Sequence, residues 1–141
     1  MNNYHEIGKE VISLHNQLRT EWPQLRRIAI ALYDKQTDEL HTFVNSNSTG
    51  SETKLPHYTE KLANVPSLQK LAKSGAARIV DDLIVFSSHS TQHSKAILES
   101  GFRSSFTVPM LTRDNTLQGF IFYDASEPSF FTPSMQDHIK L

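Results

Sequence analysis

The sequence predicts a mixed α/β domain in which a central sheet has layers packed on both of its faces. Three observations predict it: a late hairpin contains a strand that is apolar on both sides, the opening helix carries an apolar stripe, and small helices separate two strand-rich segments. At 141 residues the chain is long enough for one domain with its own core.

The late hairpin runs from Gly101 to Asp124. Its first strand, Arg103–Leu111, alternates between an apolar face of Phe106, Val108 and Met110 and a second face of Ser105, Thr107 and Pro109. Its second strand, Thr116–Asp124, is apolar on both faces, with Phe120 and Phe122 on one and Leu117, Ile121 and Tyr123 on the other. Such a strand lies in the middle of a sheet that is covered above and below.

The first helix is predicted from Asn3 to Glu21, where apolar residues recur at spacings of three and four. The stripe consists of Tyr4, Ile7, Val11, Leu14 and Leu18. Two interpretations stay open. The stripe packs on the domain's own sheet, or it joins Met135 and Ile139 of the last helix in a seam with a second copy of the chain.

The remaining elements follow from turn and capping signals. Strands are predicted over Arg27–Asp34, Glu39–Asn45 and Ala77–Asp81. Leu55–Leu62 leads into a short helix, and another is expected over His93–Ser100. A helix over Ser67–Ser74 begins after Pro66 with Ser67 as a good N-cap and ends at Gly75, while Thr132 and Pro133 start the last helix.

Composition excludes several classes of function. A net charge of −1 gives no electrostatic basis for binding nucleic acid or an acidic membrane surface. No window is apolar enough to span a bilayer, and the N-terminus has no secretory signal, so a cytoplasmic protein is expected. The absence of cysteine removes thiolate nucleophiles, disulfides and cysteine-based metal sites. No nucleophile-elbow or phosphate-loop motif occurs, so catalysis by this chain is not expected.

The hairpin carries a resemblance to a known family. Gly-Phe-Arg-Ser-Ser at 101–105, an apolar strand ending in Val-Pro-Met, a short polar turn and Leu-Gln-Gly at 117–119 resemble the signature hairpin of GAF domains. The resemblance covers nearly the whole chain. It implies an α+β fold in three layers, with an antiparallel sheet of five or six strands. The N- and C-terminal helices would cover one face, and short helices and loops would cover a small-molecule pocket on the other.

A finer resemblance concerns the arrangement of the full protein. The stretches RIAIALYD, TFVNS, SLQKLAKSG and ARIVDDL resemble GAF domains that precede HD-GYP phosphohydrolase domains, which hydrolyse cyclic di-GMP in bacteria. This implies a single GAF domain over residues 1–141, whose last helix continues into a covalently linked output domain. Two activities found among GAF-like domains, covalent bilin attachment and free methionine sulfoxide reduction, need cysteines that this chain lacks. The Asn-Lys dipeptide of cyclic-nucleotide-binding GAF domains is also missing.

Site residues are predicted around the expected pocket. The candidates are Asp82, Phe86, His93, Arg103, Ser105 and Thr107. Asp82 either caps a turn or accepts a hydrogen bond from a ligand, and Arg103 either pairs with an aspartate or holds an anion. Because side chains alternate along a strand, either Ser104 or Ser105 points away from the pocket. His89 and His93 stand four residues apart in a poor helix, a chance spacing that does not predict a metal site.

These features predict a non-catalytic sensory or regulatory domain of a bacterial signalling protein. It would be a homodimer that binds a small-molecule effector and needs no cofactor. The main alternative is a ligand-free GAF domain that serves dimerisation, and the second alternative is a stand-alone enzyme on the same fold.

Overall fold

The computed structural model describes residues 2–46, 59–83 and 101–139, and the statements below concern these residues. The elements in chain order are α1 (Asn2–Glu21), β1 (Leu25–Asp34), β2 (Glu39–Ser46), β3 (Thr59–Lys61), the 3-10 helix η1 (Leu62–Asn64), α2 (Pro66–Ser74), β4 (Arg78–Val80), β5 (Ser104–Leu111), β6 (Leu117–Ala125) and α4 (Pro133–Ile139).

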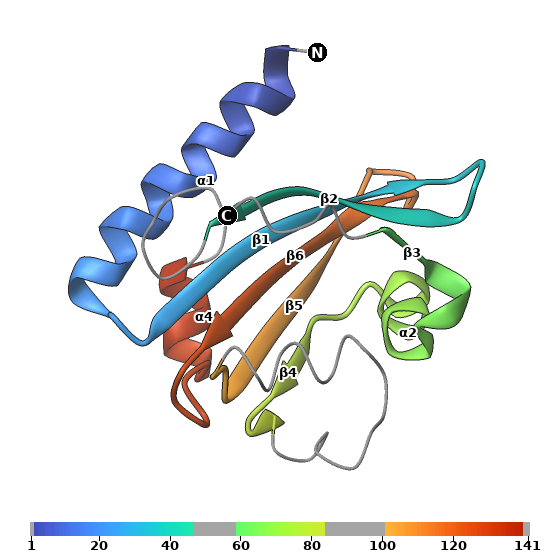
Figure 1. Ribbon diagram of the computed structural model, residues 1–141. Helices are drawn as coiled ribbons and strands as arrows, with labels where there is room; N and C mark the ends of the chain where they lie inside the picture. The colour runs from blue at the N-terminus through green and yellow to red at the C-terminus, as the bar shows by residue number, and fades with distance from the viewer. Residues whose placement is uncertain (1, 47–58, 84–100, 140–141) are drawn as a thin grey trace.

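The strands form a six-stranded sheet in the order β3-β2-β1-β6-β5-β4, and every neighbouring pair is antiparallel. Figure 1 shows β1 and β6 side by side at its centre. The predicted hairpin is formed by β5 and β6, and Asn115 in its turn adopts a positive φ of 63°. The α+β class and the antiparallel sheet of five or six strands are therefore confirmed.

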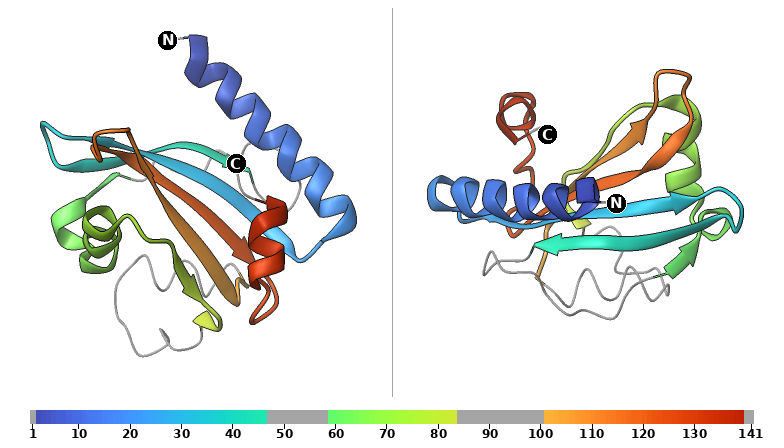
Figure 2. Two further views of the ribbon diagram at one scale, coloured as in Figure 1. Left: turned by 180° about the vertical axis from the view of Figure 1, so that it is seen from behind. Right: turned by 90° about the horizontal axis from the view of Figure 1, so that it is seen from above.

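The helices cover the two faces of the sheet separately. Val11 and Leu18 of α1 and Ile139 of α4 belong to one hydrophobic cluster, with Ile28, Ile30, Phe106 and Tyr123 of the sheet. Leu68 and Leu71 of α2 belong to a second cluster, with Ala31, Leu40, Leu62 and Phe120. Figures 1 and 2 show this arrangement, in which α1 and α4 lie on one side of the sheet and α2 lies on the other.

The alternation along the strands decides which side chain joins which cluster. In β1, Ile28, Ile30 and Leu32 face the terminal helices, while Ala31 and Tyr33 face α2, as the pattern predicts. Phe120 and Phe122 likewise face α2, and Ile121 and Tyr123 face the terminal helices. Leu117 was predicted on the Ile121 face and instead packs with the second cluster. The β5–β6 register shifts between Met110 and Leu111, the partner of Leu117, and a shift of one residue reverses the face.

Gly119 lies where β6 crosses close to β1. A β-carbon placed on Gly119 would stand 2.1 Å from the carbonyl oxygen of Ala31, and its φ is +156°. Only glycine allows this approach. Pro109, the other special residue of the hairpin, stands beyond Thr107, the last β5 residue that pairs with β4, so its missing N–H interrupts no described part of that ladder.

Three local predictions need correction or fall outside the described residues. Thr59–Lys61, expected to lead into a helix, forms the edge strand β3, and the helical turn comes after it as η1. The helix α2 begins one residue earlier than predicted, with Pro66 at its start and Val65 at the N-cap. Ser67 therefore lies inside the helix and does not cap it. The helix expected over His93–Ser100 lies outside the described residues.

Other capping predictions are confirmed. Gly75 ends α2 in the left-handed conformation, with a φ of 73°. The Thr132 hydroxyl accepts a hydrogen bond of 3.2 Å from the backbone N–H of Met135 at the start of α4. In the described ranges, no helix combines the length and the apolar character that crossing a membrane would require.

Candidate functional site

The candidate site is a group of polar side chains on the α2 side of the sheet. Its residues, called the polar patch below, are Arg27, Asn45, Arg78, Ser105, Thr107 and Asp124. They come from five strands and lie in neighbouring register positions, since Asp124 pairs with both Arg27 and Ser105, and Thr107 pairs with Arg78. At the other end of the same face, α2 and η1 pack on the apolar second cluster.

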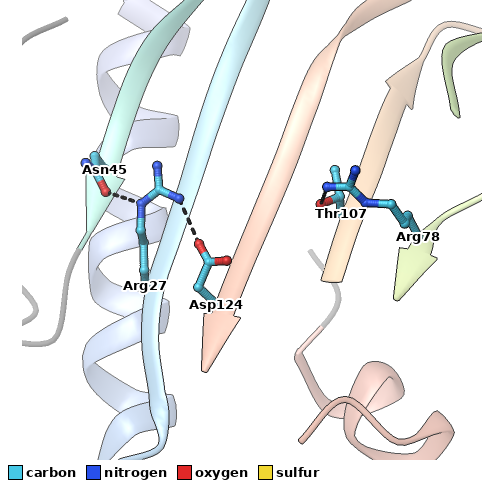
Figure 3. Close-up of polar contacts among 5 residues, drawn as sticks. All are labelled: Arg27, Asn45, Arg78, Thr107 and Asp124. Carbon is cyan, nitrogen blue, oxygen red and sulfur yellow. Dashed lines mark hydrogen bonds and ion pairs between the residues drawn. The ribbon is translucent and has the colours of Figure 1, made fainter. Parts of the chain in front are cut away.

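The first half of the polar patch is held together by Arg27. Its Nε donates to Oδ1 of Asn45 at 2.9 Å, and its Nη1 donates to Oδ2 of Asp124 at 2.7 Å (Figure 3). Asp124 and Asn45 are each only 3% exposed, so this ion pair is shielded from solvent. Shielding makes the interaction strong, and it also makes the loss of either partner costly.

The second half centres on Arg78, which β4 brings beside β5. Its Nη1 donates to the Ser67 hydroxyl at 2.8 Å. Its Nη2 donates to the Thr107 hydroxyl at 3.3 Å, as Figure 3 shows. Within the described parts of the chain its Nε is buried and has no hydrogen-bond partner. Burial lowers the pKa of the Arg78 guanidinium from its usual value, and the negative charge of Asp124 partly offsets that effect.

Two of the predicted site residues belong to this patch. Ser105 is 5% exposed and Thr107 is 1% exposed, and both face away from the terminal helices. Ser104 takes the opposite direction, as alternation requires, and its hydroxyl donates to the carbonyl of Glu127 at 2.6 Å. The prediction that one of the two serines points away is therefore confirmed, and Ser105 is the one that remains with the patch.

The other predicted site residues are placed differently. Arg103 forms a two-fold hydrogen-bonded ion pair with Asp82, in which Nε and Nη2 donate to the two carboxylate oxygens at 3.1 and 2.9 Å. Of the two roles predicted for Arg103, pairing with an aspartate is the one observed. Phe86 and His93 lie outside the described residues, as does His89.

The residues predicted for a dimer seam divide by burial. Val11, Leu18 and Ile139 are buried in the chain's own core, and Leu14 and Met135 pack partly against it. Ile7 is 38% exposed. Tyr4 lies in α1, and its side chain is outside the description. The seam stays a prediction, and Ile7 is the apolar member of the stripe that remains available on the surface.

Sequence patterns did not single out His15, a residue of α1 whose side chain is fully buried. Its Nδ1 and the Ser46 hydroxyl are 2.7 Å apart, and its Nε2 is 2.8 Å from the carbonyl oxygen of Leu25, to which it donates. Burial lowers the pKa of His15 below its usual value, and nearby Arg19 adds to that effect while the bond to Leu25 opposes it. His15 therefore ties α1 to β1 and β2.

Two further features bear on the chemistry of the chain. In residues 2–46, 59–83 and 101–139, no cluster of three or more histidine or acidic side chains is placed to hold a metal. A hollow of about 530 Å³ lies along α1. Its lining includes Lys9, Ile12, Ser13, Asn16, Gln17 and Thr20. This lining offers neutral polar groups and one lysine, whereas the polar patch offers a buried carboxylate and two half-buried guanidiniums.

A period-two signal was available for two of the four patch residues that were not predicted. Asp124 follows Phe120 and Phe122 at the same spacing, so a carboxylate extends the face that these two rings begin. Arg78 alternates with Ile79 in the same way. The pairing of Arg27 with Asp124 carries no such signal, because these residues are 97 positions apart.

Comparison with protein-family models finds no match, and neither does comparison with curated proteins. Solved structures do match. The chromophore-binding domain of an unusual bacteriophytochrome from R. palustris aligns with a TM-score of 0.61 and 14% identity, over 99% of this chain and 58% of that one. A type II free methionine-R-sulfoxide reductase from Thermoplasma acidophilum aligns with a TM-score of 0.67 and 14% identity, over 98% and 87%. The GAF domain/HD domain protein from Geobacter sulfurreducens aligns with a TM-score of 0.63 and 19% identity, over 93% and 83%.

These likenesses concern the fold. The chain spans little more than half of the bacteriophytochrome domain, and all three identities are too low to carry an activity across. The match extends over nearly the whole of this chain in each case, and it includes the six-stranded sheet. The chain has the fold of GAF domains.

Proposed function

We propose that this chain is a non-catalytic GAF sensory domain that binds a small molecule at the polar patch and regulates a covalently linked output domain. The observation that carries the proposal is the polar patch itself. On the sheet face opposite the terminal helices, Asp124 is buried and the guanidiniums of Arg27 and Arg78 are half-buried. Desolvated charges that a fold does not need for its core are a frequent mark of a binding site.

The sheet offers a route from the patch to the helices. Arg27 and Asp124 lie on β1 and β6, and the next residues, Ile28 and Tyr123, belong to the core under α1 and α4. A ligand that moves these strands therefore acts on both layers. It shifts the helices only if it binds two of their arrangements with different affinity.

The output domain is the most specific part of the proposal. We place it after the last helix and name an HD-GYP phosphohydrolase that acts on cyclic di-GMP as the candidate. The likeness to a Geobacter GAF domain/HD domain protein supports this choice. The proposal also places the protein in the cytoplasm of a bacterium. The lack of cysteine supports a non-catalytic role, because it removes the thiolate that sulfoxide reduction on a GAF-like fold is expected to need.

The proposal is tested by recording amide NMR spectra while neutral, cationic and anionic metabolites are added in separate series. A ligand of the polar patch is expected to shift the amides of Asn45, Thr107 and Asp124 before those of the β1–β2 turn. If no neutral, cationic or anionic compound shifts these three amides, the proposal that the polar patch binds a small molecule is wrong.

One observation favours the alternative of a ligand-free dimerisation module. Ile7 is 38% exposed on α1, in line with the buried Val11. A second copy of α1 would cover it. The oligomeric state of an Ile7 variant tests the seam, and ligand binding at the polar patch separates this alternative from the sensory proposal.

A further inference from the structure

One edge of the Arg78 guanidinium is almost unused. In this molecule Arg103 shows how that edge works, since its Nε and Nη2 together hold the two oxygens of Asp82 at 3.1 and 2.9 Å. On Arg78 the same edge has only the Thr107 hydroxyl, 3.3 Å from Nη2, and its buried Nε has no partner among the described residues. A buried, charged donor without an acceptor is rare in folded proteins and calls for an explanation.

The charges of the polar patch do not balance. The patch contains two guanidiniums, of Arg27 and Arg78, and one carboxylate, of Asp124. Arg27 holds that carboxylate at 2.7 Å. The described acceptors on Arg78 are two neutral hydroxyls, of Ser67 and Thr107. One positive charge on this face therefore lacks a described counter-ion at ion-pair distance, and a half-buried guanidinium is stabilised by an anion placed beside it.

We propose that the Nε–Nη2 edge of Arg78 recognises an oxyanion group, a carboxylate or a phosphate, on the small molecule that the polar patch binds. The inference rests on the proposed binding function and adds the chemical class of the ligand. Two parallel N–H donors match the two oxygens of such a group, as they match Asp82 at Arg103.

The neighbouring hydroxyls give the site its orientation. Ser67 accepts from Nη1 and fixes the far side of the guanidinium, while Thr107 accepts from Nη2 on the proposed binding edge. Because the Thr107 oxygen is the acceptor in that bond, its own proton is directed elsewhere and is placed to donate to the bound oxyanion. Figure 3 shows Arg78 turned toward Thr107, with Asp124 on the adjoining strand.

The inference is tested by titrating the purified chain with acetate or succinate in one arm and inorganic phosphate in the other. Sodium chloride keeps the ionic strength constant, which removes general screening. Binding is followed by calorimetry and by the amide shifts of Thr107 and Asp124. Two variants change the site: Arg78→Gln removes the guanidinium, and Thr107→Val removes the hydroxyl while it keeps the positive charge of Arg78. The control is Arg113→Gln, which removes an arginine from the exposed β5–β6 turn.

At least one of the two compounds, the carboxylate or the phosphate, is expected to bind the wild type and the Arg113→Gln control with equal affinity. Arg78→Gln weakens that binding by roughly tenfold or more, because two charge-assisted hydrogen bonds are lost, and Thr107→Val weakens it by a smaller factor. Circular dichroism establishes that each variant is folded. The stronger arm tells whether the group is a carboxylate or a phosphate.

Two results overturn the inference. One is oxyanion binding that Arg78→Gln and Thr107→Val leave unchanged, and the other is the absence of binding in both arms. If a neutral compound shifts the amides of Thr107 and Asp124 while neither oxyanion does, the inference fails and the proposed function stands. If no compound shifts them, both fail.

Discussion

Asp124 is the residue on which the polar patch depends most. Its carboxylate binds Arg27 at 2.7 Å, and its negative charge also acts on the guanidinium of Arg78. It is the one carboxylate of the patch. Replacing it leaves two guanidiniums on one buried face with no anion between them. Removing one partner of a buried ion pair is strongly destabilising, because the remaining charge stays buried without a partner. Breaking an exposed ion pair costs much less.

Asp124→Asn is therefore expected to lower the free energy of unfolding by about 3–5 kcal/mol. Urea denaturation followed by circular dichroism measures it. Asp82→Asn is the matched control, because it removes the same charge from a pair with Arg103 that is more exposed than the Arg27–Asp124 pair, and its effect is expected to be smaller. Equal effects of the two substitutions would show that the Arg27–Asp124 pair is not shielded.

His15 makes the stability of the domain depend on pH. Its pKa in the folded chain lies below the ordinary value of 6.5, so the unfolded chain binds the proton more readily. The stabilisation is complete above pH 6.5 and is lost as the pH falls from 6.5 toward the folded-state pKa, below which the loss levels off. The slope contributed by one such group is at most about 1.4 kcal/mol per pH unit.

The prediction is measured by urea denaturation between pH 8 and pH 5 on the wild type and on His15→Gln, which does not titrate. The wild type is expected to lose stability with falling pH more steeply than His15→Gln does. His41→Gln, which removes an exposed histidine from β2, is expected to keep the wild-type slope. If His15→Gln loses stability with falling pH as steeply as the wild type does, His15 is not the group responsible for the pH dependence.

At the scale of elements, the contact between β1 and β6 depends on a residue without a side chain. Gly119→Ala places a methyl group 2.1 Å from the Ala31 carbonyl oxygen, so the two central strands must separate. The expected loss is about 1–3 kcal/mol or more. Differential scanning calorimetry of the variant gives a lower Tm.

Gly8→Ala is the control for this substitution. Gly8 lies inside α1, and a β-carbon there would meet only a Val44 methyl group at 3.9 Å. Because glycine costs about 0.5–1 kcal/mol relative to alanine inside a helix, this variant is expected to raise the Tm. A Gly119→Ala protein as stable as the wild type would mean that β1 and β6 do not approach as closely as described.

The elements that sequence patterns predicted are those with strong local signals. The hairpin of β5 and β6, the helix α1 and the C-cap at Gly75 follow from periodicity and from residues with special backbone angles. The edge strand β3 was missed because three residues are too few to show alternation, and only its pairing with β2 makes it a strand. The prediction of Ser67 as the N-cap is wrong because α2 already begins at Pro66. The Ser67 hydroxyl instead accepts a hydrogen bond from Arg78, a tertiary contact that no local sequence rule contains.

The candidate site was predicted less completely than the fold. Ser105 and Thr107 were found because they alternate with large apolar residues in one strand. Arg27, Asn45, Arg78 and Asp124 come together only through the order of the strands in the sheet. Arg103 and Asp82 were predicted close together and form a pair with each other, away from the patch interactions described.

At the scale of the whole molecule, the exposed Ile7 on α1 indicates where two copies of the chain would associate. If α1 forms a dimer seam, the exposed Ile7 lies in it, and Ile7→Glu places a charge in an apolar contact. Light scattering across a dilution series is then expected to show a dimer for the wild type and a monomer for Ile7→Glu. Glu10→Gln, on the exposed part of the same helix, is expected to leave the dimer unchanged. A wild type that stays monomeric at high concentration contradicts the seam.

The central claim is that a small molecule bound on one face of the sheet alters the helices on the other. Amide hydrogen exchange of the chain, with and without a saturating ligand of the polar patch, tests it most directly. The account predicts that exchange changes in α1 and α4 as well as in the patch strands β1, β5 and β6, and that these changes disappear in Arg78→Gln. Exchange that changes in the patch strands while α1 and α4 stay as in the free protein would contradict the claim.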